Sequence, residues 1–219
     1  MTQTDTKIAL VTGASRGLGA ALAEELAAQG WHVVALARTM GGLEELDDRI
    51  QARGGKATLA AMDITRDDAI RALCLDIHNR WGRVDFWAHT AIYAPPLSPA
   101  NHNPLKDWDK CVSINIRATG FLIPMVAPLL AASPDKGTAL FVADAVAGQK
   151  FHAAYGASKA AQMTLARAWA AESGKLGPRV LIETAAPMAT ATRARFYPGE
   201  DRSKLTACSA EAARLISLI

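Results

Sequence analysis

The sequence predicts an α/β fold in which helices cover both faces of a doubly wound parallel sheet. Short apolar runs alternate with longer amphipathic stretches, which is typical of repeated strand–helix units. The apolar runs are almost continuously hydrophobic, as expected for strands that are covered on both faces. Gly30 and Gly54 stand where two of the amphipathic stretches should end, and glycine is a common residue just after a helix.

Six strands and five helices follow from these patterns. The expected strands are residues 8–12, 32–37, 57–62, 84–88, 139–143 and 180–184, and the expected helices lie near 17–29, 42–53, 66–81, 105–132 and 154–173. Thr65, followed by Asp68, predicts the start of the third helix, because a hydroxyl can cap free amides. Ser209 is expected to cap a last short helix after an irregular segment, 188–208. Right-handed crossovers then predict the strand order 3-2-1-4-5-6.

Length and composition limit the kind of protein. A chain of 219 residues with a net charge of +3 is expected to be one domain, residues 1–219, with no affinity for nucleic acid or a membrane surface. The first residues do not resemble a secretory signal, and the longest apolar run, 121–132, is too short for a membrane span. The three cysteines lack metal-ligand spacing, and their odd number favours reduced thiols. A cytoplasmic protein without a bound metal is expected.

The strongest local motif joins the first strand to the first helix. It has the sequence Thr12-Gly13-Ala14-Ser15-Arg16-Gly17-Leu18-Gly19, with the spacing Gly-x-x-x-Gly-x-Gly. Glycines let the backbone approach a pyrophosphate, and a helix N-terminus offers unpaired N–H groups and the positive end of its dipole. The motif therefore predicts a nucleotide-cofactor site, and a tight turn that binds nothing is the alternative.

Two arginines indicate which nucleotide to expect. In a Rossmann-type fold, an acidic residue at the end of the second strand would bind both ribose hydroxyls of NAD. This strand instead ends in Arg38, and Arg16 lies in the glycine turn. Two guanidiniums suit the additional phosphate of NADP(H), whereas either arginine alone is typical of a solvated surface. NADP(H) is therefore preferred over NAD(H).

These residues resemble the short-chain dehydrogenase/reductase family over nearly the whole chain. The family's glycine turn is matched at 12–19, its adenine-binding acid at Asp63, its active-site asparagine at Asn115, and its Tyr-x-x-x-Lys pair at Tyr155 and Lys159. Residues 179–196, followed by Tyr-Pro-Gly-Glu-Asp at 197–201, resemble a bacterial YciK-type branch. The resemblance implies cofactor contacts at Gly13, Ser15, Arg16, Gly17, Leu18, Gly19, Arg38, Asp63, Ile64, Thr90, Tyr155, Lys159 and Pro187.

The resemblance also implies the chemistry of the site. Tyr155 would exchange a proton with the oxygen of a small-molecule carbonyl or alcohol substrate, Lys159 would hold the nicotinamide ribose, and Asn115 would support them. A spacing of four places Tyr155 and Lys159 on one helix face. A phenol titrates near pH ~10, so its work at neutral pH needs a lowered pKa, which a nearby ammonium favours. An interface tyrosine beside a surface lysine is the alternative interpretation.

Three positions depart from the family pattern, and all of them face the nicotinamide end. Ala145 stands where a serine normally donates a hydrogen bond to the substrate oxygen. Thr90-Ala91-Ile92 replaces Asn-Ala-Gly after the fourth strand, and Pro187-Met188 replaces Pro-Gly after the sixth. Asp144, next to Ala145, is expected to point to the opposite face of the strand.

Two hypotheses about function follow. The first is an NADP(H)-dependent oxidoreductase that moves hydride between nicotinamide and a carbonyl or secondary alcohol. The second is a catalytically impaired homologue that binds the cofactor and acts as a sensor or subunit partner. One short helix is expected after the sixth strand, without the seventh strand that is usual in the family. A homodimer is expected through the helices near 105–132 and 154–173.

Overall fold

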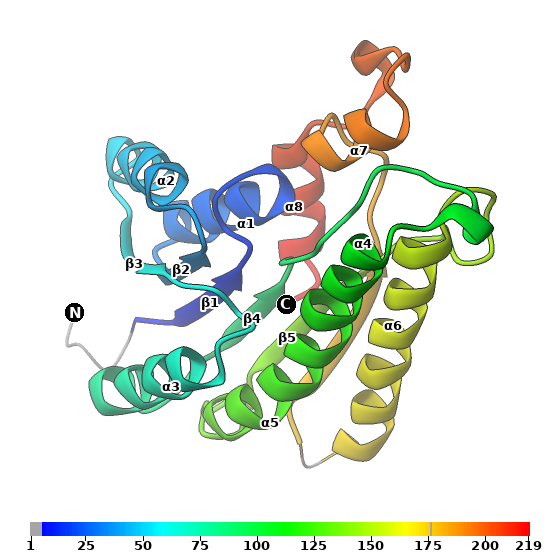
Figure 1. The fold of residues 1–219 in the computed structure, drawn as a ribbon. Coiled ribbons are helices and arrows are strands. Elements are labelled where there is room, and N and C mark those ends of the chain that lie inside the picture. The colour runs from blue at the N-terminus through cyan, green and yellow to red at the C-terminus, as the bar shows by residue number, and fades with distance from the viewer. Residues whose placement is uncertain (1–5, 176) are drawn as a thin grey trace.

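Six parallel strands form one sheet at the centre of the computed structural model, which describes residues 6–175 and 177–219 (Figure 1). The strands are β1 (Ile8–Thr12), β2 (His32–Ala37), β3 (Lys56–Ala61), β4 (Phe86–His89), β5 (Thr138–Ala143) and β6 (Arg179–Thr184). Their order is β3-β2-β1-β4-β5-β6, and each neighbouring pair is parallel. The predicted fold class and strand order are confirmed.

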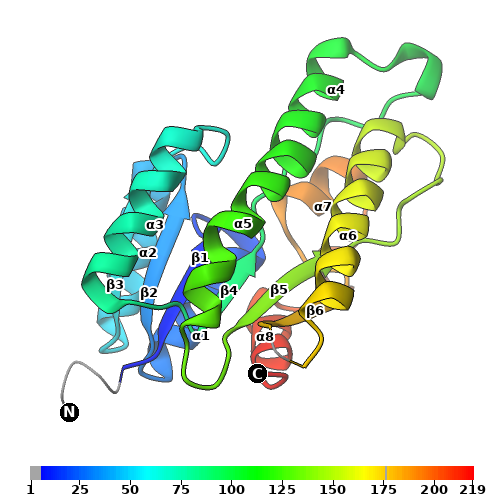
Figure 2. The ribbon, with the colours of Figure 1, turned by 90° about the horizontal axis from the view of Figure 1, so that it is seen from below.

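Helices cover both faces of the sheet, and each face has its own apolar core (Figure 1, Figure 2). One face packs against α1 (Gly17–Ala28), α2 (Met40–Ala52) and α8 (Cys208–Ile216). The other face packs against α3 (Asp67–Trp81), α5 (Ala118–Ala131) and α6 (Ala153–Ser173). Alternate residues of β1 enter the two cores, with Ala9 and Val11 on the α1 side and Ile8 and Leu10 on the α5 side. Two buried faces explain why the strands are hydrophobic at nearly every position.

One long helical run crosses the second face. It consists of α4 (Leu105–Cys111), a π-helical segment (Val112–Arg117) and α5. By length and composition alone its 27 residues could cross a membrane, and 44% of its most apolar window is buried inside the protein. Figure 2 shows this run lying along the sheet beside α6, and core helices of soluble proteins pass the same test. The run matches the helix predicted near 105–132, and the apolar run at 121–132 is only its last part.

Several element boundaries differ from the prediction. Thr65 does not cap α3: its hydroxyl donates to Asp63 Oδ1 at 2.9 Å, and the helix begins at Asp67. Ser209 lies inside α8, which begins at Cys208. The segment 188–208 contains a short helix, α7 (Ala191–Phe196), and a 3-10 turn (Arg202–Lys204), although it was expected to be irregular. Gly30 and Gly54 follow α1 and α2 with φ of +86° and +77°, as predicted for helix ends.

The carboxyl ends of the strands bring the functional loops to one edge of the sheet. Because all six strands run in the same direction, the loops that follow β1, β2, β4 and β5 leave at this edge. The loop after β4 contains a 3-10 turn (Ala100–His102), and the segment after β6 leads into α7. Figure 1 shows α7 standing above the ends of the strands, and this edge is where ligands bind in doubly wound sheets.

Candidate functional site

A cavity of about 680 Å³ opens at the carboxyl ends of the strands. It is lined by the glycine turn, the end of β2, the loops after β3, β4 and β5, the start of α6, and residues 184–197. The thirteen residues predicted to contact a cofactor all line it: Gly13, Ser15, Arg16, Gly17, Leu18, Gly19, Arg38, Asp63, Ile64, Thr90, Tyr155, Lys159 and Pro187. Residues that are far apart in the sequence therefore line the same cavity.

The glycine turn is built so that the start of α1 faces the cavity. Gly13 and Gly17 have φ of +80° and +60°, a region that side chains disfavour. A Cβ on Gly19 would overlap the Gly13 carbonyl oxygen and lie 2.5 Å from the Thr90 hydroxyl oxygen, so the helix packs directly on the turn. The first turn of α1 holds no acidic residue, and no side chain caps it. Its free N–H groups and the helix dipole make this an anion site that fits a pyrophosphate.

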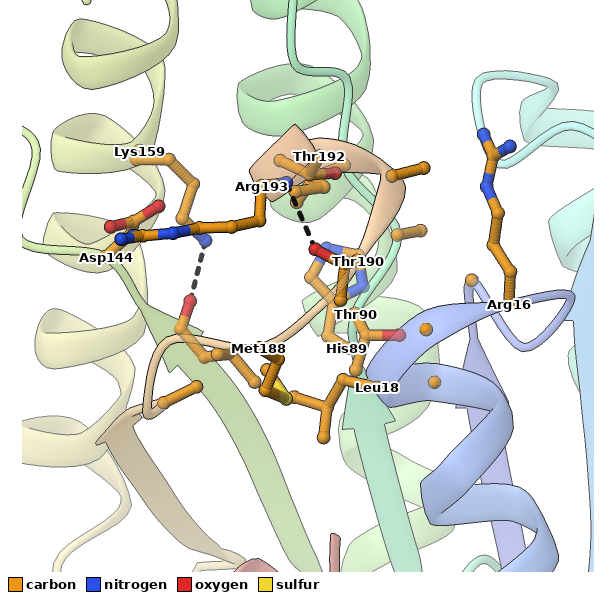
Figure 3. A pocket seen from close by; sticks show the side chains of 18 of the residues that line it. Arg16, Leu18, His89, Thr90, Asp144, Lys159, Met188, Thr190, Thr192 and Arg193 are labelled. Carbon is orange, nitrogen blue, oxygen red and sulfur yellow. Dashed lines mark hydrogen bonds between the residues drawn. The ribbon is translucent and has the colours of Figure 1, made fainter. Parts of the chain in front are cut away.

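The adenosine end of the cavity carries uncompensated positive charge. Arg16 and Arg38 both line it and are exposed. In the part of the chain that the structure describes, neither guanidinium forms an ion pair or a side-chain hydrogen bond. Figure 3 shows Arg16 projecting from the glycine turn, away from the strand ends. No acid stands at the end of β2, so this arrangement fits a phosphate better than a pair of ribose hydroxyls.

Tyr155 and Lys159 reach the other end of the cavity from the first turns of α6. The Tyr155 hydroxyl donates to Asp144 Oδ2 at 3.1 Å, and the ring is 3% exposed. Lys159 Nζ donates to the Val142 carbonyl oxygen at 2.7 Å and to Gln162 Oε1 at 2.5 Å. Figure 3 shows Lys159 and Asp144 together on this side of the pocket.

The charges around Tyr155 act against the pKa that the sequence led us to expect. Burial raises the pKa of Tyr155 well above its usual range, and the nearby Asp144 carboxylate adds to the rise. Burial lowers the pKa of Lys159 to about 8, and Asp144 partly offsets this. The lysine ammonium donates to Val142 and Gln162, and the hydrogen bond of the Tyr155 hydroxyl goes to Asp144.

Asn115 lies behind the cavity wall instead of in it. It is fully buried in the π-helical segment. Its Oδ1 accepts from the Tyr93 N–H at 2.7 Å, and its Nδ2 donates to the Tyr93 carbonyl oxygen and to Ser158 Oγ, both at 2.9 Å. Asn115 therefore ties the loop after β4 to α6, the helix that carries Tyr155.

The prediction for Asp144 is wrong. Strand alternation would have turned it to the opposite face, but β5 ends at Ala143, and Asp144 belongs to the loop that follows. Its side chain lines the cavity and accepts the Tyr155 hydroxyl. Ala145 lines the cavity as well, and its methyl group offers no hydrogen bond.

A buried polar network was not foreseen from the sequence. It runs from Thr12 through His89, Thr119 and Gln162 to Lys159. His89 Nδ1 lies 2.8 Å from Thr12 Oγ1, and His89 Nε2 lies 2.9 Å from Thr119 Oγ1. The Thr119 hydroxyl gives its proton to the Asn115 carbonyl oxygen, so it accepts from His89 Nε2–H and from Gln162 Nε2.

The network holds His89 as a neutral ring. Burial lowers the pKa of His89 to about 3, and the charge on Lys159 contributes. The hydrogen-bond pattern assigns the proton to Nε2 and leaves Nδ1 to accept from the Thr12 hydroxyl, which lies closer to Nδ1 than to its other acceptor, the Ala88 carbonyl oxygen at 3.3 Å. The chain of contacts connects the end of β1, just before the glycine turn, with the lysine at the opposite end of the cavity. The position of Gln162, three residues after Lys159 on one helix, was the signal that could have indicated it.

Helix α7 closes the cavity above Tyr155. Thr190 caps this helix by accepting from the Arg193 N–H at 3.1 Å. Arg193 Nε and Nη2 donate to the two carboxylate oxygens of Glu200 at 2.7 and 2.5 Å, and its guanidinium lies over the Tyr197 ring. The Phe196 ring packs against Tyr155, with centroids 5.0 Å apart. A group of three metal-ligating side chains is not found among the described residues.

Comparisons with known proteins agree with this arrangement. Short-chain dehydrogenase FrzI of Cladobotryum sp is 34% identical over 171 residues, which are 77% of this chain and 65% of the relative's length. The structure of the oxidoreductase yciK from E. coli has a TM-score of 0.85 at 28% identity and covers 95% of this chain and 88% of its own. A short-chain dehydrogenase from Shigella flexneri complexed with NADP has a TM-score of 0.86 at 28% identity, covering 95% of this chain and 89% of its own.

The family model described as short chain dehydrogenase matches residues 7–201. That range contains the whole cavity, from the glycine turn to α7. The chain belongs to the short-chain dehydrogenase family of oxidoreductases.

Proposed function

We propose that this protein is an NADP(H)-dependent oxidoreductase that moves hydride between nicotinamide and a carbonyl or secondary alcohol group. The observation that carries the proposal is one continuous cavity that joins the glycine turn and two unpaired arginines to Tyr155 and Lys159. NADPH, when bound, would supply the hydride. The substrate would enter beside Tyr155, under α7.

The preference for NADP(H) over NAD(H) rests on charge. Arg16 and Arg38 leave two guanidiniums without a partner at the end where an adenosine would lie. Guanidinium groups bind phosphates through paired hydrogen bonds, which suits the additional phosphate of NADP(H). The related Shigella protein was solved with NADP, which supports the same choice.

The residues that line the cavity would bind the cofactor and transfer the proton. The start of α1 would hold the pyrophosphate, and Asp63 and Ile64 would border the adenine. Lys159 would hold the nicotinamide ribose, and Tyr155 would exchange a proton with the substrate oxygen. Asn115 would keep α6 in place through Ser158.

A second candidate function is a cofactor-binding protein with little turnover, acting as a sensor or subunit partner. Two observations favour it: Ala145 offers no hydrogen bond to a substrate oxygen, and the Tyr155 hydroxyl already donates its hydrogen bond to Asp144. Losing one such donor costs on the order of a hundredfold or more in rate.

Calorimetry and turnover together separate these candidates. Titration with NADPH and NADH measures cofactor binding, and the loss of NADPH absorbance measures turnover across a panel of aldehydes, ketones and cyclic imines. Binding with turnover supports the oxidoreductase, and binding without turnover supports the second candidate. If neither nucleotide binds, both candidates fail.

We also propose a cytoplasmic, single-domain homodimer that packs through α4–α5 and α6. Leu105 and Trp108 on α4 are 77% and 41% exposed, and Ala157 and Ala160 on α6 present small exposed side chains that allow close packing. Light scattering at micromolar concentration tests the assembly, and Ala160→Arg should shift the mass to that of a monomer. A monomeric mass for the parent protein would contradict the proposal.

A further inference from the structure

The end of the cavity around Tyr155 and Lys159, which we call the reacting end, contains a carboxylate. Reduction of a carbonyl would instead need a hydrogen-bond donor there, to stabilise the oxyanion that forms. Asp144 lines the pocket directly before Ala145, and its Oδ2 lies 3.1 Å from the Tyr155 hydroxyl. Among the described residues, Tyr155 is the hydrogen-bond partner of the Asp144 side chain. The Asp144 residue is exposed to the cavity and so remains accessible to a ligand.

The amide and the two cationic side chains near Asp144 each have other hydrogen-bond partners. Gln149 Nε2 donates to the Ala145 carbonyl oxygen at 2.6 Å. The Arg193 guanidinium makes two hydrogen bonds to Glu200, and the Lys159 ammonium is held by Val142 and Gln162. Asp144 is close enough to both cations to raise their pKa values, but neither of them hydrogen-bonds to it.

This arrangement suits a carbonyl substrate less well than a positively charged one. Hydride addition to a carbonyl develops negative charge on oxygen, and a carboxylate beside that oxygen opposes it. The proton that would quench the charge is the Tyr155 proton, which Asp144 already accepts. A substrate that is positively charged before the reaction avoids both difficulties, because it needs neither an oxyanion donor nor a proton from Tyr155.

We propose that the reducible group this site takes is a protonated carbon–nitrogen double bond, an iminium, whose N–H donates to the Asp144 carboxylate. The inference rests on the proposed function, because a reduced nicotinamide is the two-electron donor. It replaces the carbonyl acceptor by its nitrogen analogue, and Tyr155 then positions Asp144 instead of transferring a proton. The iminium carbon accepts a hydride, the π-electron pair of the C=N bond moves to nitrogen, and a neutral amine is formed. The proton already on nitrogen stays there, and Tyr155 keeps its own.

Asp144 has two tasks in this scheme. Its negative charge keeps the imine nitrogen protonated, because an opposite charge at hydrogen-bond distance favours the charged form. Its hydrogen bond also sets the position of the C=N bond below α7. Tyr155 then orients the carboxylate through the 3.1 Å hydrogen bond and acts as a positioning residue for Asp144.

A binding experiment tests recognition without turnover. Calorimetry in the presence of NADP⁺ compares piperidine, which is protonated at neutral pH, with tetrahydropyran, its neutral oxygen analogue. Piperidinium should bind at least tenfold more tightly than tetrahydropyran. Asp144→Asn, which keeps the acceptor to Tyr155 but removes the charge, should abolish that preference. Asp109→Asn removes a charge from the exposed face of α4, outside the cavity, and should leave the preference unchanged.

A turnover experiment tests the reaction class. We expect a panel of cyclic imines that includes 3,4-dihydroisoquinoline to be reduced with kcat/KM at least tenfold above that of matched ketones such as 1-tetralone. Asp144→Asn should reverse or erase that ratio. A preference for the ketones, no reduction of any imine, or piperidinium binding that is unaffected by Asp144→Asn would each overturn the inference. Loss of NADPH binding in the parent protein would instead overturn the proposed function, so the two failures are distinguishable.

Discussion

The two ends of the cavity differ in how closely they follow the pattern of their family. At the adenosine end, the glycine turn, the free amides of α1 and two unpaired arginines form a complete anion site. At the reacting end, alanine stands at the serine position, a carboxylate accepts a hydrogen bond from the tyrosine, and the lysine donates to groups other than the tyrosine. We therefore expect cofactor binding and substrate chemistry to be separable properties of this edge of the sheet.

Tyr155→Phe should have the largest effect, and it tests whether catalysis can be lost while NADPH binding is kept. If the reacting end is competent, the tyrosine hydroxyl takes part in catalysis directly or by positioning Asp144, and kcat/KM should fall by about a hundredfold or more. The affinity for NADPH should change less than threefold, because the phosphate site lies at the other end. Single-turnover kinetics and calorimetry measure the two quantities. A parallel loss of binding would show that the two ends are not separable.

The buried His89 network provides a test through stability. The pKa of His89 is about 3 in the folded protein, and an unfolded histidine titrates near ~6.5. Between these values the unfolded chain binds a proton that the folded protein does not. Stability should therefore be unaffected by this group above pH ~6.5 and should fall, by up to a few kcal/mol, as the pH drops toward ~3.

Denaturant unfolding at a series of pH values, compared with His89→Gln, isolates this contribution. The variant should be about 1–3 kcal/mol less stable at neutral pH, because it breaks buried hydrogen bonds. The two curves should approach each other as the pH falls. Curves that stay parallel would show that His89 titrates normally and that the network does not hold it neutral. His78→Gln, on the exposed face of α3, is the matched control.

Replacing Ala145 by serine restores a hydrogen-bond donor at the reacting end and tests whether its absence limits the reaction. Ala145→Ser places a hydroxyl in the cavity wall, and reduction of a ketone should rise by about a hundredfold, as expected for one preorganised donor. Reduction of an iminium substrate should change little, since no oxyanion forms. Steady-state kinetics with both substrates measure the difference. An unchanged rate with the ketone would show that the carboxylate of Asp144, rather than the missing serine, limits that reaction.

The two ends of the cavity also differ in how well the sequence predicts them. The strand order and the glycine turn were predictable, because hydrophobic period and glycine spacing are local properties of the chain. The placement of Asp144 was not, because the prediction assumed that strand alternation continued past Ala143. The partners of Lys159 and His89 were not predictable either, since they depend on contacts between β1, β4, α5 and α6. Those contacts form only when the sheet and helices pack together.

The smallest effect is expected at the adenosine end, where the charges are exposed. Arg16→Ala and Arg38→Ala should each weaken NADPH binding by about tenfold, because each removes one guanidinium that can pair with a phosphate. NADH, which lacks that phosphate, should bind as before. Arg167→Ala, an exposed position on α6 outside the cavity, should alter neither affinity. Calorimetry at two salt concentrations measures these changes, and the NADPH preference should shrink at high salt. An equal loss for both nucleotides would indicate that the arginines support the turn itself instead of choosing between the cofactors.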